Sequence, residues 1–377
     1  MSDEQQVLKN FFLVFYGGVA ALSMIACAYL LLRRGNAFAD GITPPTRLRR
    51  WTAALFAAIT LSHVWYLPMY ILTSKDWVNL IYLVGGLLDS MTVFPLTIAV
   101  LLVMLQDRRR PLWPVGVVVA PLVGAGALCV AVRSVPILPF IYAYFLLMCI
   151  GLIIYMVRAT RQYGRWLHDN YADLEHKEVW QSLVVMAVML LALVIYTFEI
   201  GGQAYEYVMQ VIVAVMVCYF LWRTETLSDL SSAAQEATEK GDGHVHLAAA
   251  LDEAGHYDSS LSIRNKIGPL LKQYCEEPQL YLQNDISLSQ LAQQIGVNRV
   301  YLSQHFATQH TTYNGYINGL RIRHFINLYQ ESATAHQPVT VQQLAYQSGF
   351  HSYGTFNTAF KQVMRMTATE WMRNMTK

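Results

Sequence analysis

Seven long apolar segments occupy the first 223 residues of this 377-residue chain, and no water-soluble fold can bury them all. They cover about residues 11–32, 51–72, 78–104, 112–132, 136–157, 180–199 and 205–222. Each is near or above the roughly 20 residues with which an α-helix crosses a bilayer. Residues 1–223 are therefore predicted to form a seven-span membrane domain. The third segment is long and contains Pro95, so a kink or a tilt is expected there.

The basic residues between these segments predict an orientation. Twelve of them follow the first, third and fifth segments, whereas Lys9, Lys75 and Arg133 are the only ones on the opposite side. Loops on the cytoplasmic side of a membrane protein carry an excess of lysine and arginine. We therefore expect a multi-pass protein of a bacterial inner membrane, with its N-terminus outside and its C-terminal half in the cytoplasm. The twelve are Arg33, Arg34, Arg47, Arg49, Arg50, Arg108, Arg109, Arg110, Arg158, Arg161, Arg165 and Lys177.

Ionisable residues inside or beside the predicted spans are candidates for sensing a ligand. His63 and Asp89 lie in the middle of the second and third spans, where charged groups are costly and usually face a bundle interior. Such a pair can bind a polar ligand or a proton, or it can form a hydrogen bond that fixes how two helices pack. Glu199 and Glu206 bracket the outer loop between spans six and seven. They are either part of an acidic opening or solvated residues at the membrane interface.

The cysteines do not indicate a metal, disulfide or redox site. The five are dispersed and form no CxxC pair. The apolar half also offers no nucleophile with a neighbouring base. We therefore expect no cofactor, no metal and no enzymatic activity.

The composition changes again after the last apolar segment. Residues 224–260 are rich in polar and small side chains and are predicted to form a linker that is helical in part. Residues 261–377 have the composition of a soluble helical domain. They carry ten lysines and arginines against five aspartates and glutamates, a balance that suits a polyanionic partner.

An internal repeat lies within this last domain. Ser287–Val297 matches Thr340–Phe350, and each copy begins with a capping-box pattern and reaches a glycine suited to a helix C-terminus. A second short helix is expected after each glycine. The inward side chains of these second helices are predicted to be Leu302 and Phe306 in the first copy and Phe356 and Phe360 in the second. The pattern predicts two helix-turn-helix units.

The segment between the two copies reads as one long helix over residues 313–331. At 1.5 Å per residue such a helix is roughly 28 Å long. Successive major-groove faces of DNA lie roughly 34 Å apart. The helix therefore has a suitable length to place two second helices on adjacent turns of one duplex.

These stretches resemble the AraC/XylS-type transcription regulators. The resemblance rests on residues 288–306, 316–322, 349–361 and 371–373 and covers about the last third of the chain. It implies an all-α, seven-helix domain in which a central helix holds two helix-turn-helix units. The family usually has a glycine shortly after each second helix, where this chain has His310 and Arg365, and a proline where it has Ala368. These departures put turn geometry in question rather than the DNA-reading faces.

The resemblance implies which residues contact DNA. In the second helix of the first copy they are Asn298, Arg299, Val300, Tyr301, Ser303 and Gln304. In the second helix of the second copy they are Ser352, Tyr353, Gly354, Asn357, Thr358 and Lys361. Gln304 and Asn357 are suited to adenine and Val300 to the thymine methyl group, so an A/T-biased site is expected. Lys361, Arg321, Arg323, Lys266 and Arg264 are candidate phosphate partners or solvated surface charges.

Together these features predict a membrane-embedded transcription regulator that acts as a homodimer. Its partners would be double-stranded DNA, the lipid bilayer and an unknown signal or ligand sensed by the membrane domain. Two alternatives remain open at this point. The chain could be a transporter or channel-like protein with a regulatory cytosolic tail, or the spans could be a passive tether for the DNA-binding half.

Overall fold

The protein is all-α, and its chain divides into two compact units in a computed structural model. The structure describes residues 3–33, 35–39, 42–72, 74–132, 138–197, 202–230 and 266–375. Unit 1 contains Met1–Arg161 and Val179–Ser231, and unit 2 contains Gln162–Glu178 and Ser232–Lys377. Unit 2 thus includes a stretch that the sequence assigned to the membrane half. Glu199, Arg264 and most of the predicted linker lie outside the described residues.

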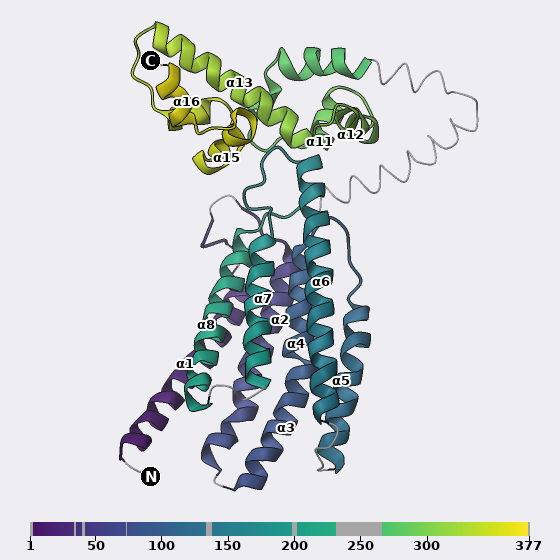
Figure 1. Ribbon diagram of the computed structural model, residues 1–377, viewed down its shortest axis with the longest axis vertical. Helices are drawn as coiled ribbons and strands as arrows, with labels where there is room; N and C mark the ends of the chain where they lie inside the picture. Colours follow the sequence, from purple (N-terminus) through teal and green to yellow (C-terminus); the bar gives the residue numbers. More distant parts are fainter. Residues whose placement is uncertain are drawn as a thin grey trace, which may run out of the picture. The chain divides into compact units, whose positions relative to one another are not determined.

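Long apolar helices build unit 1 (Figure 1). Six helical stretches of the described chain are long and apolar enough to cross a membrane, counting α3 and α4 as one. The shorter α7 is also apolar, so seven stretches correspond to the seven predicted spans. The helices are α1 (Asp3–Leu32), α2 (Thr46–Ile71), α3 (Lys75–Met91), α4 (Val93–Met104), α5 (Trp113–Val132), α6 (Leu138–Asn170), α7 (Trp180–Thr197) and α8 (Gly202–Thr226). The last turns of α6 belong to unit 2.

The third span is broken, as its proline predicts. Helix α3 ends at Met91 and α4 begins at Val93, with Thr92 between them at φ −121° and ψ −72°. Pro95 cannot donate a backbone hydrogen bond, and its ring would clash with the carbonyl of Met91 in a continuous helix. The kink expected from the sequence is therefore confirmed.

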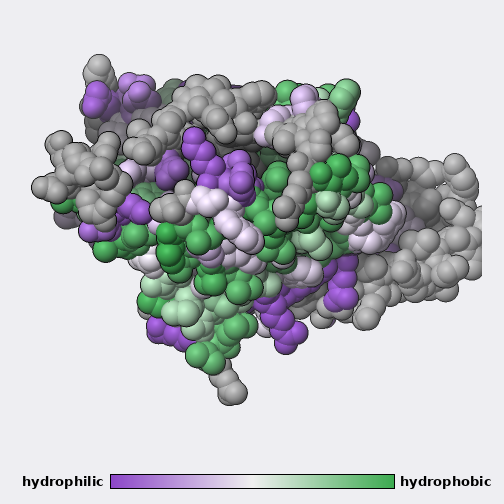
Figure 2. Space-filling view, turned by 90° about the horizontal axis from the view of Figure 1, so that it is seen from below, coloured by the Kyte–Doolittle hydropathy of each residue, from purple (hydrophilic) through white to green (hydrophobic). Residues whose placement is uncertain are grey.

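Much of the surface of unit 1 is apolar. Large hydrophobic side chains such as Val14, Leu61, Phe140, Leu147 and Leu191 are more than half exposed on their helices. Apolar side chains also cover much of the face seen in Figure 2. A soluble protein does not leave so many large apolar groups in water, whereas a lipid bilayer solvates them.

The C-terminal end of α8 is held by polar contacts inside unit 1. The carboxylate of Glu225 is fully buried, with one oxygen 3.1 Å from Arg49 Nε and the other accepting a hydrogen bond from the Tyr29 hydroxyl group. The hydroxyl groups of Thr52 and Thr224 lie 3.0 Å apart. The chain thus leaves its last apolar helix from a fixed point on α1 and α2.

Unit 2 is a helical domain with two hydrophobic cores, one for each helix-turn-helix unit. Residues 266–276 form the first helix, whose end is a π-helix (Lys272–Glu276), and the short 3-10 helix η2 (Leu280–Leu282) follows. The helices after η2 are α11 (Leu288–Gln294), α12 (Arg299–Thr308), α13 (Tyr313–Thr334), α14 (Val341–Gln347), α15 (Tyr353–Met364) and α16 (Ala368–Met375). The predicted inward residues Leu302, Phe306, Phe356 and Phe360 are all buried in these cores.

The two turns at which the chain departs from the AraC/XylS sequence pattern both contain a left-handed residue. His310 follows α12 at φ 54° and Arg365 follows α15 at φ 60°. Both are therefore left-handed, a conformation that glycine adopts with the least strain. The chain therefore keeps a left-handed residue at both turns, although neither residue is a glycine.

Candidate nucleic-acid interface

Each helix-turn-helix unit is built around a capped first helix and a left-handed glycine. Ser287 and Gln290 form a complete capping box at the start of α11, and Thr340 accepts a hydrogen bond from the Gln343 amide at the start of α14. Gly296 and Gly349 end the first helices at φ 71° and 85°. These turns aim the second helices, α12 and α15, which we call the recognition helices.

Helix α13 joins the two helix-turn-helix units within unit 2. It has 22 residues, about 33 Å at 1.5 Å per residue. Ile317 and Leu320 belong to the first core, and Ile322 and Phe325 belong to the second. One helix therefore carries side chains of both cores, and its length is close to one turn of DNA.

Some of the predicted contact residues of α12 are exposed, and others already contact the rest of the domain. Val300 and Gln304 are exposed, and Ser303 is partly so. The Asn298 side chain caps the helix by accepting a hydrogen bond from the Val300 amide. Tyr301, which the resemblance placed among the DNA-contact residues, packs in part against the first core.

Helix α15 presents its predicted contact residues more openly. Tyr353, Gly354, Thr358 and Lys361 are exposed and Asn357 is half-buried. Ser352 is the N-cap and accepts a hydrogen bond from the Thr355 amide. The free face of this helix therefore carries an aromatic ring, an amide, a hydroxyl group and one cation.

Arg321 is not available to phosphate, which corrects one of the interpretations above. It is fully buried, with Nε donating to Tyr281 O at 2.7 Å and Nη2 donating to Gln283 O at 2.6 Å and to Asn284 O at 3.1 Å. Its guanidinium group also lies 5.6 Å from the ring centre of Phe350. Burial lowers its pKa to about 10, so the group is still charged at neutral pH. Arg321 thus links the first helix-turn-helix unit to the second, both within unit 2, and does not bind a ligand.

A short segment from between two apolar helices is docked on this domain. Ala172 is fully buried in the first core, and Tyr171 pairs with Ser287 in an antiparallel bridge. Two buried amides on α13 hold its backbone, since Asn314 Nδ2 donates to Ala172 O at 2.7 Å and Asn318 Nδ2 donates to it at 3.3 Å. The segment is thus part of the folded domain, although 87 residues lie between Glu178 and Lys266, the next described residue of that domain.

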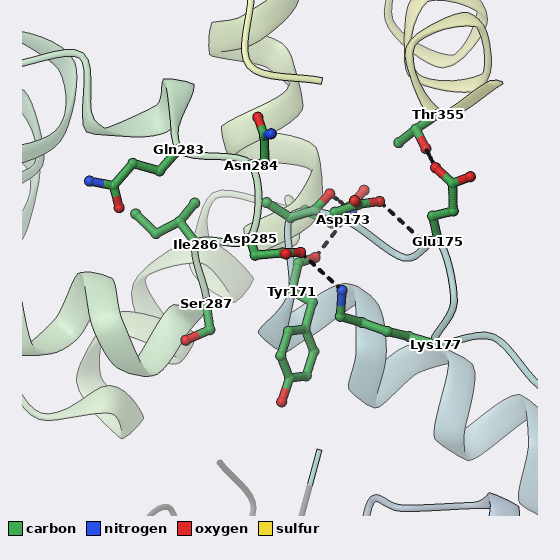
Figure 3. A network of polar contacts seen from close by, with 12 residues as sticks. Tyr171, Asp173, Glu175, Lys177, Gln283, Asn284, Asp285, Ile286, Ser287 and Thr355 are labelled. Carbon is green, nitrogen blue, oxygen red and sulfur yellow. Dashed lines mark hydrogen bonds and ion pairs between the residues drawn. The ribbon is translucent and has the colours of Figure 1, made fainter. Parts of the chain in front are cut away.

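The same segment carries polar side chains toward the rest of unit 2. Lys177 forms an ion pair of 3.3 Å with Asp285, and Glu175 accepts a hydrogen bond from the Thr355 hydroxyl group at 3.1 Å (Figure 3). Asn170 Oδ1 accepts from Arg299 Nε at 3.1 Å and also from Nη2. Burial lowers the pKa of Arg299, and burial raises the pKa of the Asp173 carboxyl group in the docked segment. Arg299 and Thr355 lie in the first turns of the two recognition helices.

The candidate sensing residues in unit 1 come together in part. His63 is buried on α2, with Nε2 3.0 Å from Gln210 Oε1 on α8 and Nδ1 2.8 Å from Ile59 O. Asp89 on α3 interacts with His63 and with the hydroxyl groups of Ser62 and Tyr66. Its Oδ1 atom is buried without a hydrogen-bond partner among the described residues. Glu206 lies one turn before Gln210 on α8.

The sequence interpretation missed the residues that hold the docked segment. Asn314 and Asn318 are polar groups spaced four apart on the inner face of α13, where apolar residues are expected. A buried polar pair of this kind requires hydrogen-bond partners, because buried amides are almost always hydrogen-bonded. Among the described residues, no group of three or more histidines, cysteines or carboxylates could hold a metal ion.

Comparison with known proteins bears on this last part of the chain. Residues 291–374 match a family described as a helix-turn-helix domain. The match runs from α11 to α16 and so includes both helix-turn-helix units and the central helix. No curated protein and no solved structure matches the chain.

Proposed function

We propose that this chain, whose residues 291–374 form a helix-turn-helix domain of the AraC type, is a membrane-embedded regulator that couples a signal in its apolar half to transcription. DNA binding rests on the matched domain and on the spacing that α13 imposes on α12 and α15. The membrane placement is supported by six helices of sufficient length and hydropathy. We infer from the excess of arginine after the first, third and fifth spans that the C-terminal half is cytoplasmic. We further propose that the regulator acts as a homodimer.

The exposed side chains of the recognition helices supply the chemistry for reading bases. Gln304 on α12 is exposed and Asn357 on α15 is half-buried, and both carry amides suited to adenine. Val300 offers an apolar contact for the thymine methyl group. These residues support an A/T-biased recognition site, and the exposed Lys361 supports a phosphate contact next to it.

Selection of duplexes from a random pool tests this function directly. The full chain in detergent is expected to enrich an A/T-biased sequence, with an affinity that falls steeply as salt rises. Replacing Gln304 or Asn357 with alanine is expected to weaken binding to the enriched site by about 1–3 kcal/mol each and to relax base selectivity. Gln293→Ala on α11 is the matched control and is expected to leave binding unchanged. Failure of the wild-type chain to select any sequence at any salt concentration would contradict the proposal.

We also propose that His63 and Asp89 form the sensing site. Their support is a polar cluster that connects α2, α3 and α8 and contains a buried carboxylate oxygen without a hydrogen-bond partner among the described residues. Carboxyl groups buried among membrane helices are rare and usually face a bundle interior or a cavity that serves a ligand or an ion. Transmission to DNA would then pass through the helices that the cluster joins.

A reporter gene under the selected site tests the sensing role. His63→Ala and Asp89→Asn are each expected to shift the signal dose for half-maximal response roughly tenfold or more, as for a coupling of 1–3 kcal/mol. DNA affinity of the purified variants should stay unchanged. Ser23→Ala is the control, because its buried hydroxyl group donates to Val19 O within α1 alone. A response equal to that of the wild type in both variants would exclude this site.

A further inference from the structure

Residues 162–178 are chemically unlike the domain on which they are docked. They contain Asp169, Asp173, Glu175 and Glu178 against only Arg165 and Lys177. Residues 261–377 carry twice as many cations as carboxylates. An acidic segment therefore lies against a domain whose surface charge suits a polyanion.

The contacts of this segment fall on the recognition helices. Asn170 holds the Arg299 guanidinium group at the first residue of α12, and Glu175 holds the Thr355 hydroxyl group in the first turn of α15. Asp169 lines a shallow hollow together with Ser303 of α12. One continuous segment thus reaches both helices that would enter DNA.

A DNA strand would offer the same groups to the same partners. Phosphate oxygens accept hydrogen bonds from arginine, from threonine hydroxyl groups and from the N-terminal turns of helices. Asn170 Oδ1 and Glu175 Oε2 already accept hydrogen bonds from Arg299 and Thr355. A phosphate can take the Thr355 hydroxyl hydrogen, or bind the Nε and Nη2 edge of Arg299 in a bidentate manner, only after these hydrogen bonds have been broken.

The segment is also anchored at its centre, apart from the side-chain contacts that it makes with the recognition helices. Tyr171 and Ala172 are buried and fixed by Ser287, Asn314 and Asn318. Asn170 and Glu175 stand on either side of this anchor and each makes its contact through its side chain. The side-chain contacts can therefore open without loss of the core.

We propose that residues 169–178 are a built-in competitor for DNA, which holds Arg299 and Thr355 until phosphate replaces Asn170 and Glu175. This inference rests on the proposed DNA-binding function. The segment begins in the last turn of α6 and ends just before α7, so the inference also assigns the place at which the apolar half can change DNA affinity. A shift of either helix that loosens the segment raises the affinity, and one that tightens it lowers the affinity.

Titration of the full chain in detergent with its selected duplex tests the competition. Asn170→Ala is expected to bind about tenfold more tightly than the wild type, because a hydrogen bond to a charged group no longer has to be broken. In an Arg299→Ala background the same change is expected to have no effect, since the two residues then share no contact. Glu175→Ala is expected to raise affinity severalfold more than Glu277→Ala, which removes an exposed carboxylate elsewhere in unit 2.

Hydrogen exchange of the α13 amides shows whether each variant keeps its fold. Wild-type affinity in Asn170→Ala, together with equal gains for Glu175→Ala and Glu277→Ala, would overturn the inference and leave the segment as a structural support. A gain for Asn170→Ala that persists without Arg299 would overturn it as well. Absence of selective binding in every protein, the wild type included, would instead sink the proposed function on which the inference depends.

Discussion

Replacing Arg321 with methionine is expected to destabilise unit 2 by about 3–5 kcal/mol, because several backbone acceptors lose their donor at about 1–3 kcal/mol each. The acceptors are Tyr281 O, Gln283 O and Asn284 O, in and just after η2. Methionine fills much of the space but donates nothing. The loss should appear as faster hydrogen exchange in α11 and α13, measured on the full chain in detergent.

Arg323→Met is the matched control for this change. Arg323 lies two residues further along the same helix but is exposed to solvent. Its replacement is expected to change stability by less than about 0.5 kcal/mol. Equal protection of the α13 amides in the two variants would show that the carbonyl contacts of Arg321 contribute little.

Replacing Gly349 with alanine is expected to cost about 2–5 kcal/mol, from two separate effects. A left-handed residue other than glycine costs about 1–2 kcal/mol, and Gly349 lies at φ 85°. A Cβ atom here would also come within 2.7 Å of the Leu282 backbone, and overpacking of this kind costs about 1–3 kcal/mol. The second helix-turn-helix unit should therefore loosen from η2, with faster exchange in α14 and α15.

Gly296→Ala separates the two effects, because the equivalent turn of the first helix-turn-helix unit has space for a Cβ atom. Gly296 lies at φ 71°, and a Cβ atom there would meet nothing within 4 Å. Only the conformational cost of about 1–2 kcal/mol is expected. Should the two alanine variants lose the same stability, the close approach of Gly349 to Leu282 would have no energetic weight.

The sequence carried enough information for the helices because each has a local signal. Long apolar runs mark α1 to α8, Pro95 marks the break between α3 and α4, and the caps and glycines mark both helix-turn-helix units. The inward positions of α12 and α15 followed from spacing alone, since residues four apart share a helix face. These features depend on neighbours in sequence, which a single chain displays.

The roles of Arg321 and of residues 162–178 depend on distant partners and could not be predicted in this way. An arginine on α13 of a basic domain resembles a phosphate donor until its three carbonyl partners are known. Residues 162–178 resemble an ordinary loop between two spans, with charges typical of the cytoplasmic side. Their docking follows from Asn314 and Asn318, which lie more than 130 residues away.

The domain that holds the helix-turn-helix units is discontinuous in the chain, and this sets the order in which the protein can be made. The ribosome completes Tyr171 and Ala172, and then two further apolar helices, before any residue of α11 exists. The first core closes only when the late helices return to a peptide already tied to α6 and α7. A fragment that began between residues 231 and 265 would lack Ala172 and would leave Asn314 and Asn318 without their carbonyl partners, so water would have to take the place of the segment in the first core.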